Sequence, residues 1–270
     1  MKINRTSWLA AGLSLLLASF VPAARAATVA YTTGDLVLAF RADGGTGTSQ
    51  SLLIDIGAAS LYNAAVGNPN LVLNVGTFGA DLVSTYGANW YDRTDLTWSV
   101  FGANDTSNPN AILYASRAET TFGTAASAWP TLTDPGDRTN TRTNISQVTS
   151  AFAGLDATAN SSVSALQTNS SDPGSYSQQV TFGSTDFGSL SQWTNIQGNF
   201  GAGSEALSLF RLNASTTNLG AFTISDAGAV TFSGTSVNIA GAAPEPSKAV
   251  FSMLGATVLL MRRRRPAVRA

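Results

Sequence analysis

The sequence predicts a mainly β fold, an antiparallel β-sandwich or barrel with two or three inserted helices. Three observations lead to this expectation. Apolar and polar residues alternate in nine short segments, and Gly, Asn, Asp and Pro separate those segments, which is typical of strands. The segments do not alternate with helices in the rhythm of βαβ units, which disfavours a parallel sheet. Only a few stretches show a helical period.

The nine expected strands share a period of two in hydrophobicity. They are residues 35–41, 51–57, 70–76, 95–101, 112–117, 206–212, 219–225, 229–233 and 236–240. Asp226-Ala227-Gly228 is a turn sequence between two of them, so residues 219–233 are expected to form a hairpin.

Helices are expected where this alternation stops. Residues 80–86 are predicted to form a short helix that ends at Gly87. Residues 144–167 place apolar side chains at three- and four-residue spacing, which predicts a longer helix, bent or split at Gly154. Residues 190–196 are expected to add one helical turn, and residues 169–177 to form a loop.

Two residue types are missing from the chain, and their absence excludes several chemistries. Without cysteine there is no disulfide, thiolate metal site or Cys nucleophile. Without histidine there is no Ser-His-Asp triad and no imidazole base or zinc ligand. Residues 27–240 hold six arginines, no lysine and fifteen acidic residues, a net charge of −9, which would repel a phosphate backbone. We therefore expect no nucleic-acid partner.

Residues 1–26 have the three parts of a secretory signal peptide. Lys2 and Arg5 precede an apolar run, and Ala24-Arg25-Ala26 supplies the small-x-small pattern that signal peptidase reads. The expected cleavage lies between Ala26 and Ala27, and the expected partners are the Sec translocon and signal peptidase. The alternative is an uncleaved anchor helix, but the run is shorter than a bilayer span.

The C-terminal residues also fall into three parts. Residues 241–248 form an extended linker, because Pro244 and Pro246, on either side of Glu245, disfavour a helix. Residues 249–261 are mostly apolar and are expected to enter the membrane as a short transmembrane helix. Residues 262–270 begin with Arg262, Arg263, Arg264 and Arg265, which favour a cytoplasmic position and stop transfer across the membrane.

This tail resembles the PEP-CTERM sorting signal of Gram-negative bacteria. The resemblance rests on Pro244, Glu245 and Pro246, the apolar run and the four arginines. It implies that an exosortase-type membrane protease removes the tail and that the protein belongs to an exopolysaccharide or biofilm surface system. The implied course is an inner-membrane-anchored precursor that becomes a cell-surface or secreted protein. The alternative is a C-terminal anchor that is never cleaved.

Three features of the mainly β extracellular domain, residues 27–240, are candidate sites. Asp92 and Asp95 flank Arg93 beside Trp90-Tyr91, as in a carboxylate pair or a sugar contact, but a paired loop explains them more simply. Asp134-Pro135-Gly136-Asp137 and Asp43-Gly44-Gly45 could hold Ca²⁺, although ordinary turn chemistry suffices. Trp90, Trp129 and Trp193 could stack on sugars, but packing is the better expectation for each.

These patterns favour a non-enzymatic structural or adhesive role at the cell surface or in the extracellular matrix. The alternative is a carbohydrate-binding β-sandwich module, with or without calcium, and a carboxylate-based glycosidase is a weaker third hypothesis. We assign no catalytic residue, no metal ligand and no cofactor. The expected partners are the sorting protease, the export machinery, the membrane during sorting, and extracellular polysaccharide as a candidate ligand.

Overall fold

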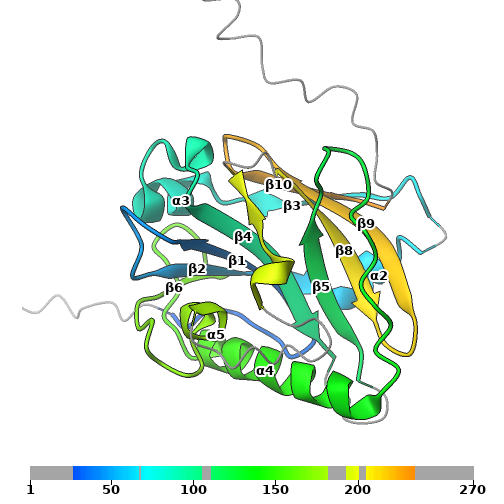
Figure 1. Cartoon of the computed structure of the whole chain (residues 1–270). Coiled ribbons are helices and arrows are strands. Elements are labelled where there is room, and N and C mark those ends of the chain that lie inside the picture. The colour runs from blue at the N-terminus through cyan, green and yellow to red at the C-terminus, as the bar shows by residue number, and fades with distance from the viewer. Residues whose placement is uncertain (1–26, 67, 105–110, 182–192, 201–204, 235–270) are drawn as a thin grey trace, which may run out of the picture.

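The structure is a computed structural model that describes residues 27–66, 68–104, 111–181, 193–200 and 205–234. Its centre is one antiparallel sheet of ten strands that curls into an open half-barrel (Figure 1). The mainly β, antiparallel prediction is confirmed at this level. The strands form one continuous sheet, and no pairing joins its two ends within the described ranges, so the half-barrel is open.

The strands are β1 (Asp35–Ala42), β2 (Ser51–Ala58), β3 (Val72–Thr77), β4 (Leu96–Ala103), β5 (Leu113–Ala118), β6 (Ser164–Gln167), β7 (Gly198–Asn199), β8 (Ala206–Leu212), β9 (Thr216–Ile224) and β10 (Ala229–Ser233). Their order across the sheet is β3-β10-β9-β8-β5-β4-β1-β2-β6, and β7 pairs with β4. The expected β9–β10 hairpin is present, with Phe222 opposite Phe232. The expected strand at residues 236–240 lies outside the described residues.

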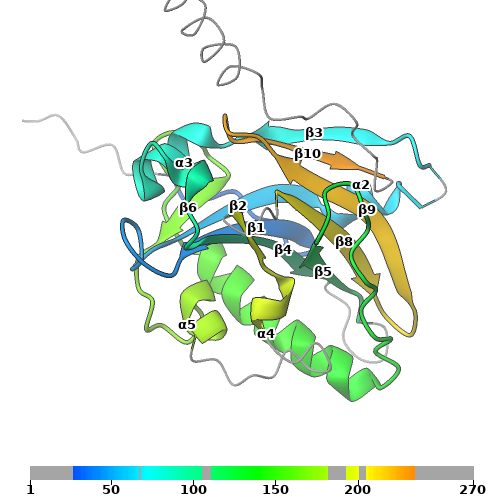
Figure 2. The ribbon, with the colours of Figure 1, turned by 45° about the horizontal axis from the view of Figure 1, so that its top comes forward.

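The helices are α2 (Ala59–Asn63), α3 (Gly79–Tyr86), α4 (Pro135–Ala153) and α5 (Tyr176–Thr181), with 3₁₀ turns η2 (Trp90–Asp92) and η4 (Trp193–Ile196). The short helix before Gly87 and the turn containing Trp193 are therefore confirmed. Figure 2 shows α4 and α5 on the outer face of the sheet, under β4 and β5.

The central part of the sheet is buried on both faces. Inside the curl, alternate residues of each strand form one core, and the rings of Phe40, on β1, and Trp98, on β4, stack there with centroids 6.3 Å apart. On the outer face the intervening residues form a second core with α4, which includes Phe101 and Phe152. Central strands such as β1 and β4 are therefore buried along almost their whole length.

The prediction for the long helix was wrong at both ends. We expected residues 144–167, but α4 begins at Pro135, and Gly154 is its C-cap. The start was missed because Arg138 and Thr141, which are polar, lie on the buried face of the first turns and hide the apolar period. The end was wrong because residues 164–167 form strand β6, paired with β2.

The expected signal peptide, the Pro-Glu-Pro linker, the transmembrane segment and the arginine run fall in residues 1–26 and 235–270, outside the described residues. The first described residues are tied to the fold by their backbone. Ala157 N donates to Ala27 O at 2.8 Å, and Val29 N donates to Leu155 O at 2.9 Å.

Candidate functional site

The loop after β1 and the turn before β4 meet at Arg93. The Arg93 guanidinium donates from Nε to Asp95 Oδ1 and from Nη2 to Asp95 Oδ2, both at 2.8 Å. It also donates to the carbonyl oxygens of Gly44 at 2.6 Å, Thr46 at 2.7 Å and Tyr86 at 2.9 Å. Two candidate sites, at Asp43–Gly45 and Asp92–Asp95, are therefore one structural corner.

This corner is organised around a cation that the chain itself supplies. The carbonyl oxygens of Gly44 and Thr46, which a Ca²⁺ site would need, accept from Arg93. Asp43 makes an ion pair with Arg41. Gly47 is required here, because it has a φ of +81° and a Cβ would lie 2.6 Å from the Tyr86 ring. These contacts stabilise the fold, and they explain why these residues occur here without a role in metal binding.

The carboxylates at this corner do not form a glycosidase pair. The hydrogen bonds from Arg93 hold the pKa of Asp95 below its usual value, whereas a general acid needs a raised pKa. Asp92 is exposed on η2. The arrangement supplies a stable ion pair, and it does not supply a carboxylic acid poised to protonate a leaving group.

The second calcium candidate is the start of α4. Asp134 is its N-cap, Pro135 occupies the first turn, and the Asp134 carboxylate accepts from Gly136 N at 2.7 Å. Asp137 lies in the first turn, where a negative charge complements the helix dipole. Within the described ranges, no three Asp or Glu side chains gather closely enough to hold a metal ion.

The three tryptophans near loops are buried. The exposed fractions of Trp90, Trp129 and Trp193 are 1%, 6% and 1%. Trp90 packs edge-on against Phe200, and the guanidinium of Arg117 lies 4.6 Å from the centre of the Trp129 ring. The expectation of packing is confirmed, because a sugar could not reach these ring faces without displacing the core.

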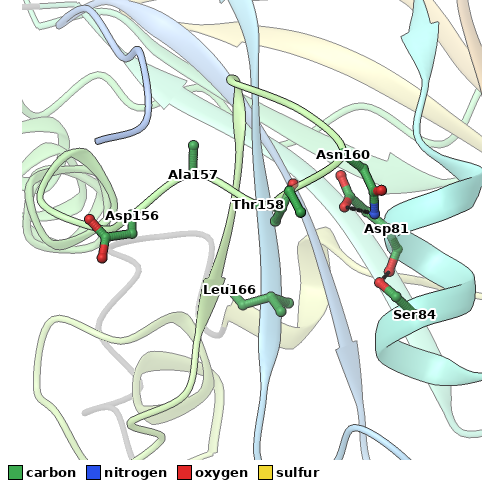
Figure 3. Close-up of a pocket in the computed structure, with 8 residues that line it drawn as sticks. Asp81, Ser84, Asp156, Ala157, Thr158, Asn160 and Leu166 are labelled. Atoms are coloured by element: carbon green, nitrogen blue, oxygen red, sulfur yellow. Dashed lines mark hydrogen bonds between the residues drawn. The ribbon is translucent and has the colours of Figure 1, made fainter. Parts of the chain in front are cut away.

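A pocket of about 380 Å³ lies elsewhere, between α3 and the turn before β6. Its lining residues are Asp81, Ser84, Asp156, Ala157, Thr158, Ala159, Asn160 and Leu166. Figure 3 shows Asp81 and Asn160 facing each other, with the Asp156 carboxylate turned away from both. Asn160 Nδ2 donates to Asp81 Oδ1 at 3.0 Å, and Ser84 Oγ donates to Asp81 O at 2.9 Å.

This pocket combines hydrogen-bonding groups of both kinds with one apolar wall. The exposed Asn160 amide can donate and accept, and the exposed Ser84 offers a hydroxyl, while the buried Asp81 carboxylate accepts from Asn160. Leu166, on β6, provides the apolar surface. Such a set suits a small ligand rich in hydroxyl groups, and the volume is at the lower end of the range for small-molecule sites. Sequence reasoning missed it because Asp81 and Asn160 are 79 positions apart.

Comparison with protein-family models, with curated proteins and with solved structures finds no match. In the part of the chain that the structure describes, no helix is both long and apolar enough to cross a membrane.

Proposed function

We propose that this chain is an exported surface protein that is sorted through its C-terminal tail and serves a structural or adhesive role without catalysis. In this proposal, residues 1–26 form the signal helix and residues 249–261 a short transmembrane helix. The observation that carries the proposal is the order of Pro244-Glu245-Pro246, a short apolar run and Arg262–Arg265, together with the residue pattern of a signal peptide in residues 1–26.

The body is consistent with a scaffold. The central strands of its sheet are buried on both faces, its described tryptophans are in the core, and Arg41 and Arg93 pair with Asp43 and Asp95. A surface protein without disulfides depends on packing to keep its shape. The two hydrophobic cores on the two faces of the sheet provide this packing.

The sorting proposal is tested by mapping the C-terminal peptides of the full chain, expressed in a Gram-negative host that encodes an exosortase. We expect the surface form to end near the Pro-Glu-Pro motif and the inner-membrane form to retain the arginine run. Glu245→Ala with Pro246→Ala should leave the precursor in the inner membrane. Pro173→Ala, in an exposed loop of the body, is the matched control and should be sorted normally. Recovery of an intact Arg262–Arg265 run from the outer surface would refute the proposal.

The pocket at Asp81 and Asn160 favours a second candidate function, weak binding of a hydroxyl-rich glycan unit. Such a unit could exchange hydrogen bonds with the exposed Asn160 amide and the exposed Ser84 hydroxyl. Asp81, which is only 2% exposed, accepts from Asn160 and holds its amide in place. The pocket has no aromatic wall among its lining residues, so the expected affinity for a single sugar is low, with a Kd of about 1 mM.

A glycan array probed with the exported chain tests this second function. Asp81→Asn should reduce binding, because it weakens the hydrogen bond that holds the Asn160 amide. Asp92→Asn, at an exposed position outside the pocket lining, is the matched control. Equal binding by the native chain and Asp81→Asn would remove this pocket as the site. An array without any bound glycan, followed by a titration in solution with sugars to about 10 mM that shows no binding, would remove carbohydrate binding and would leave the sorting proposal intact.

A further inference from the structure

The two edge strands of the curled sheet differ in whether the chain covers their outer edge. At β6, the chain covers the outer edge itself, because Ala157 bridges to Ala165 and Thr158 N donates to Ser164 O at 2.8 Å. At the opposite end, β3 pairs with β10 on one side, and no described segment pairs with its other side. Figure 2 shows β3 along this free margin of the sheet. An open edge offers a row of backbone donors and acceptors to another strand.

Strand β3 lacks the charged and proline residues that usually protect such an edge. Its sequence is Val-Leu-Asn-Val-Gly-Thr, without Lys or Pro. The pairing with β10 shifts register between Val230 and Thr231, which bends the second half of β3. The first half, Val72–Asn74, pairs regularly with β10 and is therefore the part best shaped to accept another strand.

Exposed apolar side chains are concentrated in the segment that leads into this half of the edge. Of the four large apolar residues exposed in the described ranges, Leu61, Val66 and Val72 come from the one run that leads into β3, and Val72 is 64% exposed. Ala65 and Leu71 both lie against Gly234, with Cβ atoms 3.0 and 3.3 Å from where a Gly234 Cβ would be. The backbone segments that carry Val66 and Val72 therefore approach each other near Gly234, beside the start of β3.

The charge of this region indicates which partner fits it. Residues 56–80 carry no charged side chain, although residues 27–240 have a net charge of −9. Two copies of so acidic a body repel each other over most of their surfaces, and the repulsion is weakest where neither copy carries charge. A basic partner would be attracted to the acidic surfaces and would gain nothing from this neutral one.

We propose that the β3 edge is a self-association surface, on which β3 of a second copy of this chain adds antiparallel to Val72–Asn74. Antiparallel pairing of the same strand gives a two-fold interface, in which each copy offers the same backbone groups and the same apolar side chains to the other. The two sheets then run on as one, and Val66 and Val72 of both copies leave water together. This inference does not depend on the sorting signal or on glycan binding.

The test is analytical ultracentrifugation of the exported chain at protein concentrations from about 1 µM to about 1 mM, a range that covers the dissociation constants of weak dimers. Intact mass spectrometry defines the two ends of the chain that is used. The edge variant carries Val72→Lys and Asn74→Lys, both at exposed positions, so each lysine can reach water without disturbing the core. Val83→Lys is the matched control, because Val83 is the fourth exposed apolar residue, 45% exposed, and lies on α3, which follows the end of β3 opposite to Val72. Circular dichroism melting shows that each variant is folded, and Asn74→Lys alone replaces the double variant if that one is not.

We expect the native chain and Val83→Lys to dimerise, and the edge variant to raise the dimer Kd at least about tenfold. Hydrogen exchange of the β3 amides should slow as the concentration of the native chain rises. A chain that stays monomeric throughout the range refutes the proposal, as does an edge variant that associates like the native chain. A monomer whose β3 amides are protected at every concentration also refutes it, because the chain then covers the edge with its own residues.

Discussion

The guanidinium of Arg93 binds the carboxylate of Asp95 through two parallel hydrogen bonds of 2.8 Å. This planar geometry leaves Nη1 and the second hydrogen of Nη2 for carbonyl oxygens, which come from Gly44, Thr46 and Tyr86. The Arg93 side chain therefore connects the β1–β2 loop and the end of α3 to the residue that directly precedes β4.

Replacement of Arg93 by lysine should lower the free energy of unfolding by about 1–3 kcal/mol. An ammonium group cannot reproduce the bidentate contact, and it leaves at least one of the three carbonyl oxygens without its donor. Urea denaturation measures the change. Asp92→Asn is the matched control, because Asp92 is exposed one residue away, and its effect should stay within about 0.5 kcal/mol. Equal stability of Arg93→Lys and the native chain would show that the corner is held by other contacts.

Asp55, on β2, gives the fold a dependence on pH. Burial raises the pKa of its carboxyl from 3.8 to about 6; Gly57 N, which donates to it at 2.7 Å, opposes this shift, and the nearby Asp35 adds to it. Between about pH 4 and pH 6 the folded chain therefore binds more protons at this site than the unfolded chain does. The contribution of Asp55 to stability is complete below this window and is lost as the pH rises through it.

Asp55→Asn should flatten the stability of the chain between about pH 4 and pH 6 and raise it at pH 7, because an amide can still accept from Gly57 and carries no charge. For a half-buried group the gain is on the order of 1 kcal/mol after allowance for solvent screening. Thermal melting across this pH range measures it, and Asp226→Asn, in an exposed turn, is the control. A variant with the native slope would mean that another group controls this range.

Glu119 is buried just beyond β5 and fastens the loop that follows it. Its Oε1 accepts from Ser208 Oγ at 2.8 Å and its Oε2 from Gly123 N at 3.0 Å, while Ser208 Oγ accepts from Ala126 N at 3.0 Å. The loop is thus joined to β8 through one carboxylate and one hydroxyl.

Glu119→Gln should cost about 1–2 kcal/mol, because the amide nitrogen would face a donor that needs an acceptor. Because Glu119 and Ser208 contact each other, a double-mutant cycle with Ser208→Ala should give a coupling of at least about 0.5 kcal/mol. Hydrogen exchange at Gly123 and Ala126 should accelerate in both single variants. Additive effects with unchanged exchange at these two amides would show that the loop is fastened elsewhere.

The strands could be predicted from the sequence because each has one strongly apolar face. The burial of the second face could not be predicted, because it carries polar residues such as Ser99, Ser116 and Ser208. In an alternating pattern such residues indicate a face that is exposed to solvent. They are buried because each finds a partner: Ser116 Oγ, for example, accepts from Val100 N and donates to Ile196 O. Such partners are distant in sequence, and no local rule identifies them.

The same limit applies to the sites. The Arg93–Asp95 pair is local, so its simplest explanation was already visible in the sequence. The Asp81–Asn160 pocket was not, because α3 and the turn before β6 meet only in the folded chain. Residues 70–76 were predicted to form a strand. The position of this strand at the margin of the sheet depends on the strand order, which could not be predicted from the sequence pattern.

The start of α4 separates the two explanations of Asp134, a calcium ligand or a helix cap. As a cap, its carboxylate satisfies Gly136 N, one of the backbone donors that the first turn leaves without a partner. Asp134→Ala should then lower the free energy of unfolding by about 1 kcal/mol, while Asp134→Asn or Asp134→Ser, which also cap, should recover most of it. A calcium ligand would behave differently, because an amide or hydroxyl would weaken metal binding.

Calcium titration completes this last prediction. If Asp134 is only a cap, about 1 mM Ca²⁺, enough to load typical extracellular sites, should leave the Tm of the native chain and of Asp134→Ala equally unchanged. Mg²⁺ at the same ionic strength controls for screening of the acidic body. A rise in Tm that is specific to Ca²⁺ and is lost in Asp134→Asn would overturn the capping explanation, since the asparagine retains the cap and weakens only the metal site.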